Sequence, residues 1–308
     1  MQNSFDAIRK ELPNYSKVVI IGHIQPDGDC VGSSLGMKHL LKDNFGVDAI
    51  VVNQELARFS FLGEWTLPGI VDYSDAFVIQ VDNATRARSA DPDFINAPCI
   101  LKIDHHLVID SYGHYNVEKK KPSCCEIIAE DAINAGLEIG KEAARCLYTG
   151  MVTDTGRFSF PGVTADSLRT ASRMLDTGFD FPQLMADISK REMRNVKFTA
   201  YAYNQIQITE KGVVWMYIPQ SAIDSFGITY DMVNDALSVM HAIAGHPVYV
   251  LFSDLYDKIR VEFRSDRVKL NQVAEYFGGG GHNFAAGARL SSADRIPEVL
   301  AELDKLLD

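Results

Sequence analysis

Short apolar runs alternate with longer segments of helical periodicity through the first half of the chain. The apolar runs cover residues 17–22, 49–52, 76–81 and 99–103. Helical patterns cover residues 29–42, 123–135, 141–151 and 164–177. Strands that alternate with helices predict parallel strands joined by helical crossovers. The first half is therefore expected to form an α/β domain with a mainly parallel sheet flanked by helices.

The pattern changes after residue 180. Residues 181–203 are charged and helix-compatible, and predict a helix between two domains. Beyond it lie strand-like runs at residues 213–218, 248–255 and 259–263, and helical patterns near residues 230–244, 270–276 and 292–307. The sequence thus predicts a first domain over residues 1–180, a helical linker over 181–205, and a smaller mixed α/β domain over 206–308.

Length and charge agree with this division. A chain of 308 residues favours two domains, because single cores usually stop growing before this size. Hydrophobic content of 46% and charged content of 23% are typical of soluble globular proteins. The formal charge of -11 argues against binding of long duplex DNA, which depends on Lys and Arg neutralising phosphates. A short or small anionic substrate stays open.

The cysteines and the N-terminus bear on location. Five cysteines, Cys30, Cys99, Cys124, Cys125 and Cys146, form no CxxC pair and are expected to be reduced core residues of a cytoplasmic protein. The N-terminal segment lacks the apolar core of a signal peptide. No run approaches the roughly 18 to 20 apolar residues that span a bilayer. We therefore expect no membrane partner, and the sequence leaves open whether the chain forms a homodimer.

Polar, ligand-forming side chains follow several of the apolar runs. Asp104, His105 and His106 end the run at residues 99–103, and further clusters lie at His23 to Asp29, at Asp82 and at Asp154. In parallel sheets, ligands bind beyond the carboxyl ends of the strands. His23, Asp82 and the Asp104 triplet all fall at that position, so these clusters are expected to meet in space.

The residue types predict a metal centre. His23, Asp27 and Asp29 supply one nitrogen and two oxygen donors within seven residues, although Asp29 alone could be only a helix N-cap. Mixed imidazole and carboxylate ligation suits Mn, Fe, Co or Zn better than Ca, and Mg also fits. Clustered carboxylates repel one another unless cations neutralise them. The sequence therefore predicts two divalent metal ions, with Mn favoured and Mg, Co or Fe as alternatives.

The ordered motifs HxxPDGD, VD, DHH and TDTGRF resemble the four motifs of the DHH phosphoesterase superfamily. They are residues 23–29, 81–82, 104–106 and 153–158 here, and the resemblance covers about residues 17–180. The glycine-rich segment at residues 277–287 resembles the signature of the substrate domain associated with that superfamily. The resemblance implies a dinuclear-metal phosphoesterase with its active site in the cleft between the two domains.

The resemblance also implies a role for each candidate residue. His23, Asp27 and Asp82 are expected to hold one metal, and Asp29, Asp82, His105 and Asp154 the other, with Asp82 as the bridge. His106 is expected to act on the phosphoryl group or the leaving oxygen, with Asp104 orienting a neighbouring histidine. The residues expected to bind substrate are Arg264, Ser265, Gly279, Gly280, Gly281 and His282.

Within the superfamily, the chain is most similar to bifunctional oligoribonucleases, the nanoRNases. The similarity implies hydrolysis of short oligonucleotides such as pApA to 5'-mononucleotides, removal of the 3'-phosphate of 3'-phosphoadenosine 5'-phosphate (pAp), or both. The alternatives are a cyclic or linear dinucleotide phosphodiesterase, a RecJ-like single-strand exonuclease and a non-catalytic nucleotide or metal sensor. One departure bears on substrate preference: residues 107–113 read LVIDSYG in place of a Pro-Ser-Asn continuation.

Overall fold

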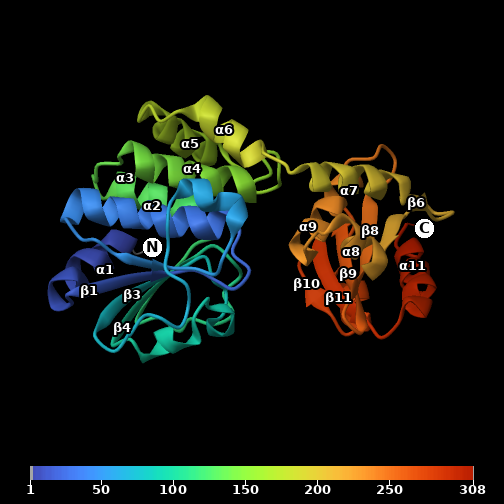
Figure 1. Cartoon of the computed structure of the whole chain (residues 1–308), viewed down its shortest axis with the longest axis horizontal. Helices are drawn as coiled ribbons and strands as arrows, with labels where there is room; N and C mark the ends of the chain where they lie inside the picture. Colours follow the sequence, from blue (N-terminus) through green and yellow to red (C-terminus); the bar gives the residue numbers. More distant parts are fainter. Residues whose placement is uncertain (1–2, 308) are drawn as a thin grey trace. The chain divides into compact units, whose positions relative to one another are not determined.

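The computed structural model describes residues 3–307, apart from the side chains of Tyr230 and Asp231. It divides into two compact units, Met1–Lys190 and Arg191–Asp308, each with its own sheet and core (Figure 1). Within the described residues, no helix has the length and apolar character needed to cross a bilayer.

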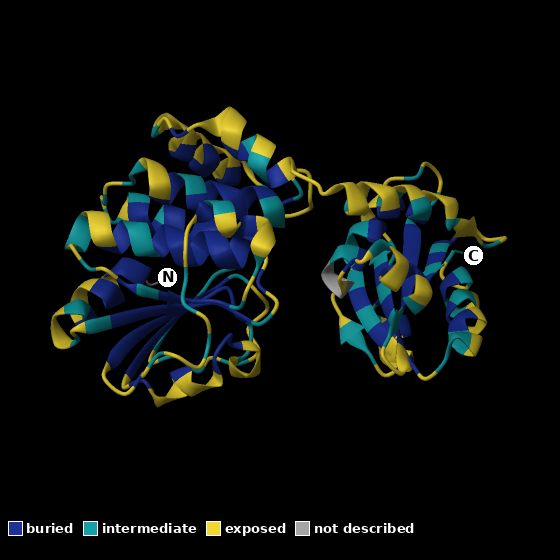
Figure 2. Ribbon diagram, viewed as in Figure 1, coloured by how far each residue is buried: buried dark blue, intermediate teal, exposed yellow. Residues whose placement is uncertain are grey.

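The first unit is built on a five-stranded parallel sheet with the strand order β2-β1-β3-β4-β5. Its strands are β1 (Lys17–Ile21), β2 (Ile50–Val52), β3 (Ala76–Val81), β4 (Cys99–Asp104) and β5 (Tyr115–Glu118). The central strands β3 and β4 are buried along their whole length, which explains why their sequences are mostly apolar apart from Gln80, Lys102 and the terminal Asp104 (Figure 2). The predicted parallel α/β architecture is confirmed.

The α-helices of this unit share a core with one face of the sheet. They are α1 (Ser4–Glu11), α2 (Gly28–Phe45), α3 (Cys124–Asn134), α4 (Lys141–Asp154), α5 (Ala165–Asp176) and α6 (Phe181–Ser189). Helices α1, α2 and α3 contact the sheet, α4 packs on α2 and α3, and α5 and α6 pack on α4 (Figure 1). Loops and short 3-10 helices, including η4 (Pro92–Asn96), contribute to the core on the other face.

The second unit is a six-stranded mixed sheet with the order β10-β11-β9-β8-β7-β6, in which only β7 and β8 are parallel. Its strands are β6 (Gln207–Ile208), β7 (Val214–Ile218), β8 (Val248–Leu255), β9 (Lys258–Ser265), β10 (Gly280–Gly281) and β11 (Ala285–Leu290). Its helices are α7 (Met193–Asn204), α8 (Gln220–Phe226), α9 (Tyr230–Asn234), α10 (Asn271–Tyr276) and α11 (Ile296–Asp304). Two core clusters cover the sheet, one including α10 and α11, the other α7 and α8.

Some expected elements differ from those observed. In place of the helix expected over residues 181–203, the structure has two helices, α6 and α7, separated by residues 190–192. In place of the helix expected over 230–244, it has the short helix α9 followed by a 3-10 helix (Asp235–Val239). Strands β5 and β11 and helix α8 were not predicted. The small residues of β11 have low strand propensity, so pairing with β9 decides its structure. The predicted domain boundaries stay predictions.

Candidate metal centre

The polar clusters of the first unit meet at one edge of the sheet. His23 lies two residues beyond β1, Asp82 directly follows β3, and Asp104 is the last residue of β4. These three strands are neighbours in the sheet, so their carboxyl ends lie side by side. Asp29 in the first turn of α2 and Asp154 at the end of α4 complete the group. Residues far apart in sequence thus converge as expected.

Asp82 lies at the centre of this group. Its Oδ2 is 3.4 Å from His23 Nε2, and its Oδ1 is 3.3 Å from His105 Nε2. The residue is 2% exposed, and Oδ1 makes no directional hydrogen bond with any described residue. Its φ of 54° is a left-handed conformation, which Asp tolerates better than most residues. Asp82 is therefore a buried carboxylate that lies close to both candidate ligand histidines, and its predicted bridging role stays a prediction.

A second set of donors lies on the other side of His105. Its Nε2 is 3.4 Å from Asp154 Oδ2 and 3.9 Å from Asp29 Oδ2. The Asp29 carboxylate accepts hydrogen bonds from the first two backbone N–H groups of α3, at 2.6 Å from Cys124 and 2.9 Å from Cys125. The positive end of a helix therefore orients this buried carboxylate.

Asp27 has a different local role from Asp29. Its Oδ1 accepts from the N–H groups of Asp29 and Cys30, each at 3.0 Å, so Asp27 is the N-cap of α2. The alternative that Asp29 is only an N-cap is therefore wrong. Among the described residues, three groups could hold a metal ion: His23 with Cys30 and Asp82, Asp82 with His105 and His106, and Asp29 with His105 and Asp154. Asp27 belongs to none of these groups, so its predicted ligand role stays a prediction.

The electrostatics of the cluster favour a cation. Burial, together with the charge of Asp82, raises the pKa of Asp29 to about 7. Burial and the charges of Asp29 and Asp82 raise the pKa of Asp154 to about 9. Burial opposes ionisation of Asp82 too, but His105 and His23 hold its pKa well below the usual range. Divalent cations would neutralise this crowded charge and supply a partner for Asp82 Oδ1, so the donor set fits them.

Behind His106 lies a chain of charged side chains. His106 Nδ1 is 2.8 Å from Asp104 Oδ1, and Asp104 Oδ2 forms an ion pair with Lys102 Nζ at 3.3 Å. Lys102 is fully buried and also donates to Glu118 at 2.6 Å and to the backbone carbonyl oxygens of Ala84 and Asp110. Lys102 was not among the predicted site residues. The available signal was a lysine inside a buried strand, two residues before Asp104 and therefore on the same face.

The loop after His106 carries three exposed aliphatic residues. Leu107, Val108 and Ile109 are 63%, 62% and 71% exposed. The loop is anchored directly afterwards, because Arg86 donates to both carboxylate oxygens of Asp110 at 2.9 and 2.8 Å. The departure from the superfamily pattern therefore places an apolar surface directly after His106.

The predicted substrate residues lie together in the second unit. Arg264 and Ser265 end β9, Gly280 and Gly281 form β10, and the His282 N–H donates to Ala285 of β11 at 2.8 Å. The Ser265 hydroxyl accepts from the N–H groups of two following residues, so it stabilises a turn. The His282 side chain is exposed. The predicted active site between the two domains stays a prediction.

The glycines of this segment divide into structural and open positions. A Cβ on Gly279 would lie 2.0 Å from the Gly287 carbonyl oxygen, whereas a Cβ on Gly280 would meet nothing within 4 Å. We expect Gly279→Ala to reduce the free energy of unfolding by roughly 1–3 kcal/mol, through overpacking against β11. Gly280→Ala is the matched control and should change it by less than about 0.5 kcal/mol. Urea unfolding of both variants checks this, and equal stabilities would contradict it.

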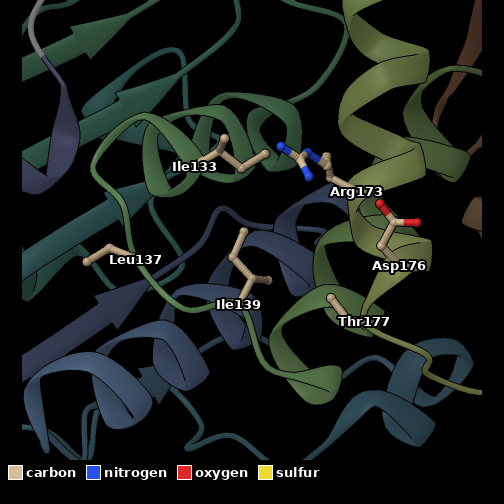
Figure 3. A pocket seen from close by; sticks show the side chains of 6 residues that line it. All are labelled: Ile133, Leu137, Ile139, Arg173, Asp176 and Thr177. Atoms are coloured by element: carbon tan, nitrogen blue, oxygen red, sulfur yellow. The ribbon is translucent and has the colours of Figure 1, made fainter.

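A separate pocket of about 330 Å³ opens in the first unit (Figure 3). It is lined by Ile133, Leu137, Ile139, Arg173, Asp176 and Thr177. These residues come from the end of α3, the loop after it and the end of α5. None of the predicted site residues lines this pocket, so it plays no part in the metal centre.

Comparisons with known proteins identify both units. Residues 17–151 match the N-terminal domain of the DHH family, and residues 210–308 match the DHHA1 domain. A Streptococcus mutans protein named probable bifunctional oligoribonuclease and PAP phosphatase NrnA is 32% identical over 99% of both chains. A Bacillus subtilis protein named bifunctional oligoribonuclease and PAP phosphatase NrnA is 29% identical over 95% of both chains.

A solved structure has the same fold. It is the crystal structure of an exopolyphosphatase-related protein from Bacteroides fragilis, with a TM-score of 0.82, 20% identity, and coverage of 100% of this chain and 96% of the other. The predicted resemblance is confirmed by relatives that span nearly the full length. The chain therefore belongs to the DHH family and carries a DHHA1 domain after its DHH domain.

Proposed function

We propose that this protein is a dinuclear-metal phosphoesterase that hydrolyses short oligonucleotides such as pApA to 5'-mononucleotides and removes the 3'-phosphate of pAp. The full-length relatives are named for these two activities, and their names bear out the predicted hydrolase class. The structural observation that carries the proposal is Asp82, a buried carboxylate between His23 and His105 with one oxygen unsatisfied.

The chain's own residues divide the work at such a centre. Two divalent cations, with Mn favoured, would be held by His23, Asp27, Asp29, Asp82, His105 and Asp154, and would activate water and neutralise charge on the phosphoryl group. Asp82 would bridge the two sites, and Asp29 is oriented for its role by α3. The protein then needs few acids or bases of its own, which fits a cluster made almost entirely of metal-binding side chains.

His106 is the group proposed to act on the substrate. With its proton on Nδ1, His106 would donate to Asp104 Oδ1 at 2.8 Å, which would leave Nε2 available for a phosphoryl or leaving-group oxygen. The side chain is 39% exposed, whereas Asp104 is fully buried. This difference supports His106 as the residue that meets substrate and Asp104 as the residue that orients it.

A Mn-supplemented activity panel tests the function. It compares pApA, longer 5'-phosphorylated oligomers, pAp, cyclic dinucleotides and pyrophosphate. We expect turnover of pApA and pAp that is lost with a chelator. Preference for a cyclic dinucleotide would favour the phosphodiesterase alternative, and processive digestion of long single strands would favour the RecJ-like one. Cation binding without hydrolysis of any of these compounds would point to a sensor.

Arg264 is proposed to contact a substrate phosphate together with His282 and the adjacent glycines. We expect Arg264→Gln to raise KM for pApA about tenfold or more, since an Arg–phosphate contact is charge-assisted. The Mn content should stay at the wild-type level, because Arg264 lies in the second unit. Steady-state kinetics with metal analysis checks this. An unchanged KM and kcat would remove Arg264 from the substrate site.

We also propose a cytoplasmic setting and short substrates rather than long duplex DNA. All five cysteines are free and buried, as suits a reducing compartment. The net charge of -11 suits local phosphate contacts better than a long basic track. A homodimer stays open, and sedimentation of the purified protein would decide it.

A further inference from the structure

Three charged residues alternate along β9 on one face of the second unit's sheet. Arg260, Glu262 and Arg264 are partly exposed, while the intervening residues Val261 and Phe263 are buried. Because side chains of a strand alternate between its faces, the three charged residues share a face. Strand β9 thus presents a row of charge, with Arg264 at one end and Arg260 four residues away.

The neighbouring strand β11 adds a further arginine and little else to this face. Arg289 pairs directly with Arg260, Gly287 with Glu262 and Ala285 with Arg264. Because Gly287 and Ala285 have little or no side chain, they project little above the sheet beside Glu262 and Arg264. Next to Gly287 stands Gly280 of β10, where an added Cβ would meet nothing. On the other side of β9, the paired residues Ser253, Leu251 and Tyr249 of β8 are buried, so the open part of this face lies over β9, β11 and β10.

The charges on this face are not balanced. Glu262 forms ion pairs with Arg260 at 2.6 Å and with Arg264 at 3.1 Å, so one carboxylate serves two guanidinium groups. The side chain of Arg289 is exposed and makes no hydrogen bond or ion pair within the described part of the chain. Like charges directly opposite one another destabilise a sheet. An anion between Arg260 and Arg289 would remove this repulsion.

We propose that Arg260 and Arg289 form a second phosphate site, which binds a further phosphate of oligonucleotides longer than a dinucleotide. This inference rests on the proposed function, with Arg264 as the first phosphate contact. Glu262 stands between Arg264 and Arg260 on β9 and pairs with both, so a phosphate at Arg264 and a phosphate at Arg260 and Arg289 would occupy separate positions on either side of this carboxylate. Arginine suits the second site because its planar guanidinium binds phosphate through two parallel hydrogen bonds. The second site makes affinity depend on oligomer length.

Arg289→Gln is the most direct test, because the Arg289 side chain has no partner among the described residues that the change would leave unpaired. The probes are 5'-phosphorylated oligoadenylates of two to five nucleotides. With Mn, we expect KM for the dinucleotide to change less than about twofold, and KM for the longest oligomers to rise roughly fivefold to tenfold. In metal-free buffer, where hydrolysis is blocked, the slope of log affinity against log salt for the longest oligomer should fall by about 0.7.

Arg295→Gln is the matched control. It removes the same charge from a partly exposed arginine of the same unit, one that pairs with Glu298 and packs on Phe277. In this variant, KM should depend on oligomer length as it does in the wild-type protein. The second site would be overturned if Arg289→Gln raised KM equally for oligoadenylates of all lengths. It would also be overturned if the change left KM unaltered for all of them. Wild-type protein that fails to hydrolyse the dinucleotide would overturn the proposed function instead, and the metal-free binding series would still test the second site.

Discussion

Asp82→Asn is expected to reduce Mn-dependent hydrolysis of pApA by at least about a thousandfold, because the change removes the charge of the carboxylate shared by both proposed metal sites. Asparagine is the appropriate replacement. It has nearly the same shape, and it tolerates the left-handed backbone at residue 82, where φ is 54°. Alanine would add backbone strain and confuse loss of activity with loss of folding.

The measurement combines kinetics with metal content and thermal unfolding. Mn should raise the melting temperature of the wild-type protein, because the ion binds only the folded state, and this increase should shrink in Asp82→Asn. Asp110→Asn is the control, since Asp110 pairs with Arg86 outside the cluster. Near-normal turnover in Asp82→Asn, with two metals still bound, would overturn the bridging assignment.

Lys102→Met is expected to lower the free energy of unfolding by about 3–5 kcal/mol. The change leaves the buried carboxylates of Asp104 and Glu118 without their cation, and removing one partner of a buried ion pair strands the other charge. Methionine keeps most of the side-chain volume, so the loss reports charge rather than packing. Urea unfolding at neutral pH measures the difference.

Two further variants make the Lys102 result specific. Lys120→Met removes an exposed lysine nearby and should change stability by less than about 0.5 kcal/mol. Lys102→Met combined with Glu118→Gln should recover part of the loss, because one stranded charge is then neutral. If the free energy of unfolding of Lys102→Met alone lies within about 1 kcal/mol of the wild-type value, the buried lysine does not hold this charge network together.

The sequence predicts most of the first unit because its signals are local and strong. The runs that became β1, β3 and β4 are mostly apolar, with Gln80 and Lys102 as buried exceptions, as is usual for strands covered on both faces. Because the carboxyl ends of parallel strands lie together, the positions of these runs also predict that His23, Asp82 and Asp104 lie at one end of the sheet. Strand β11 was not predicted because its small residues have low strand propensity, and its pairing with β9 is what makes it a strand.

The parts of the site that the sequence could not predict depend on which residues face one another. That Asp27 rather than Asp29 caps α2 follows from the backbone of one turn, which the letters PDGD do not determine. That Arg289 stands opposite Arg260 follows from strand register, which no motif records. The role of Lys102 needed the knowledge that β4 is buried on both faces.

The candidate metal centre gathers residues from position 23 to position 154, on three neighbouring strands and two helices. A chain emerging from the ribosome therefore cannot assemble the centre until α4 has been made and packed on α2. Assembly of the full centre is then a late event in the folding of the first unit, because its last proposed ligand lies at the end of α4. Truncated products that end before Asp154 lack one proposed ligand, and scarcity of the cation leaves the finished fold with its crowded carboxylates unneutralised.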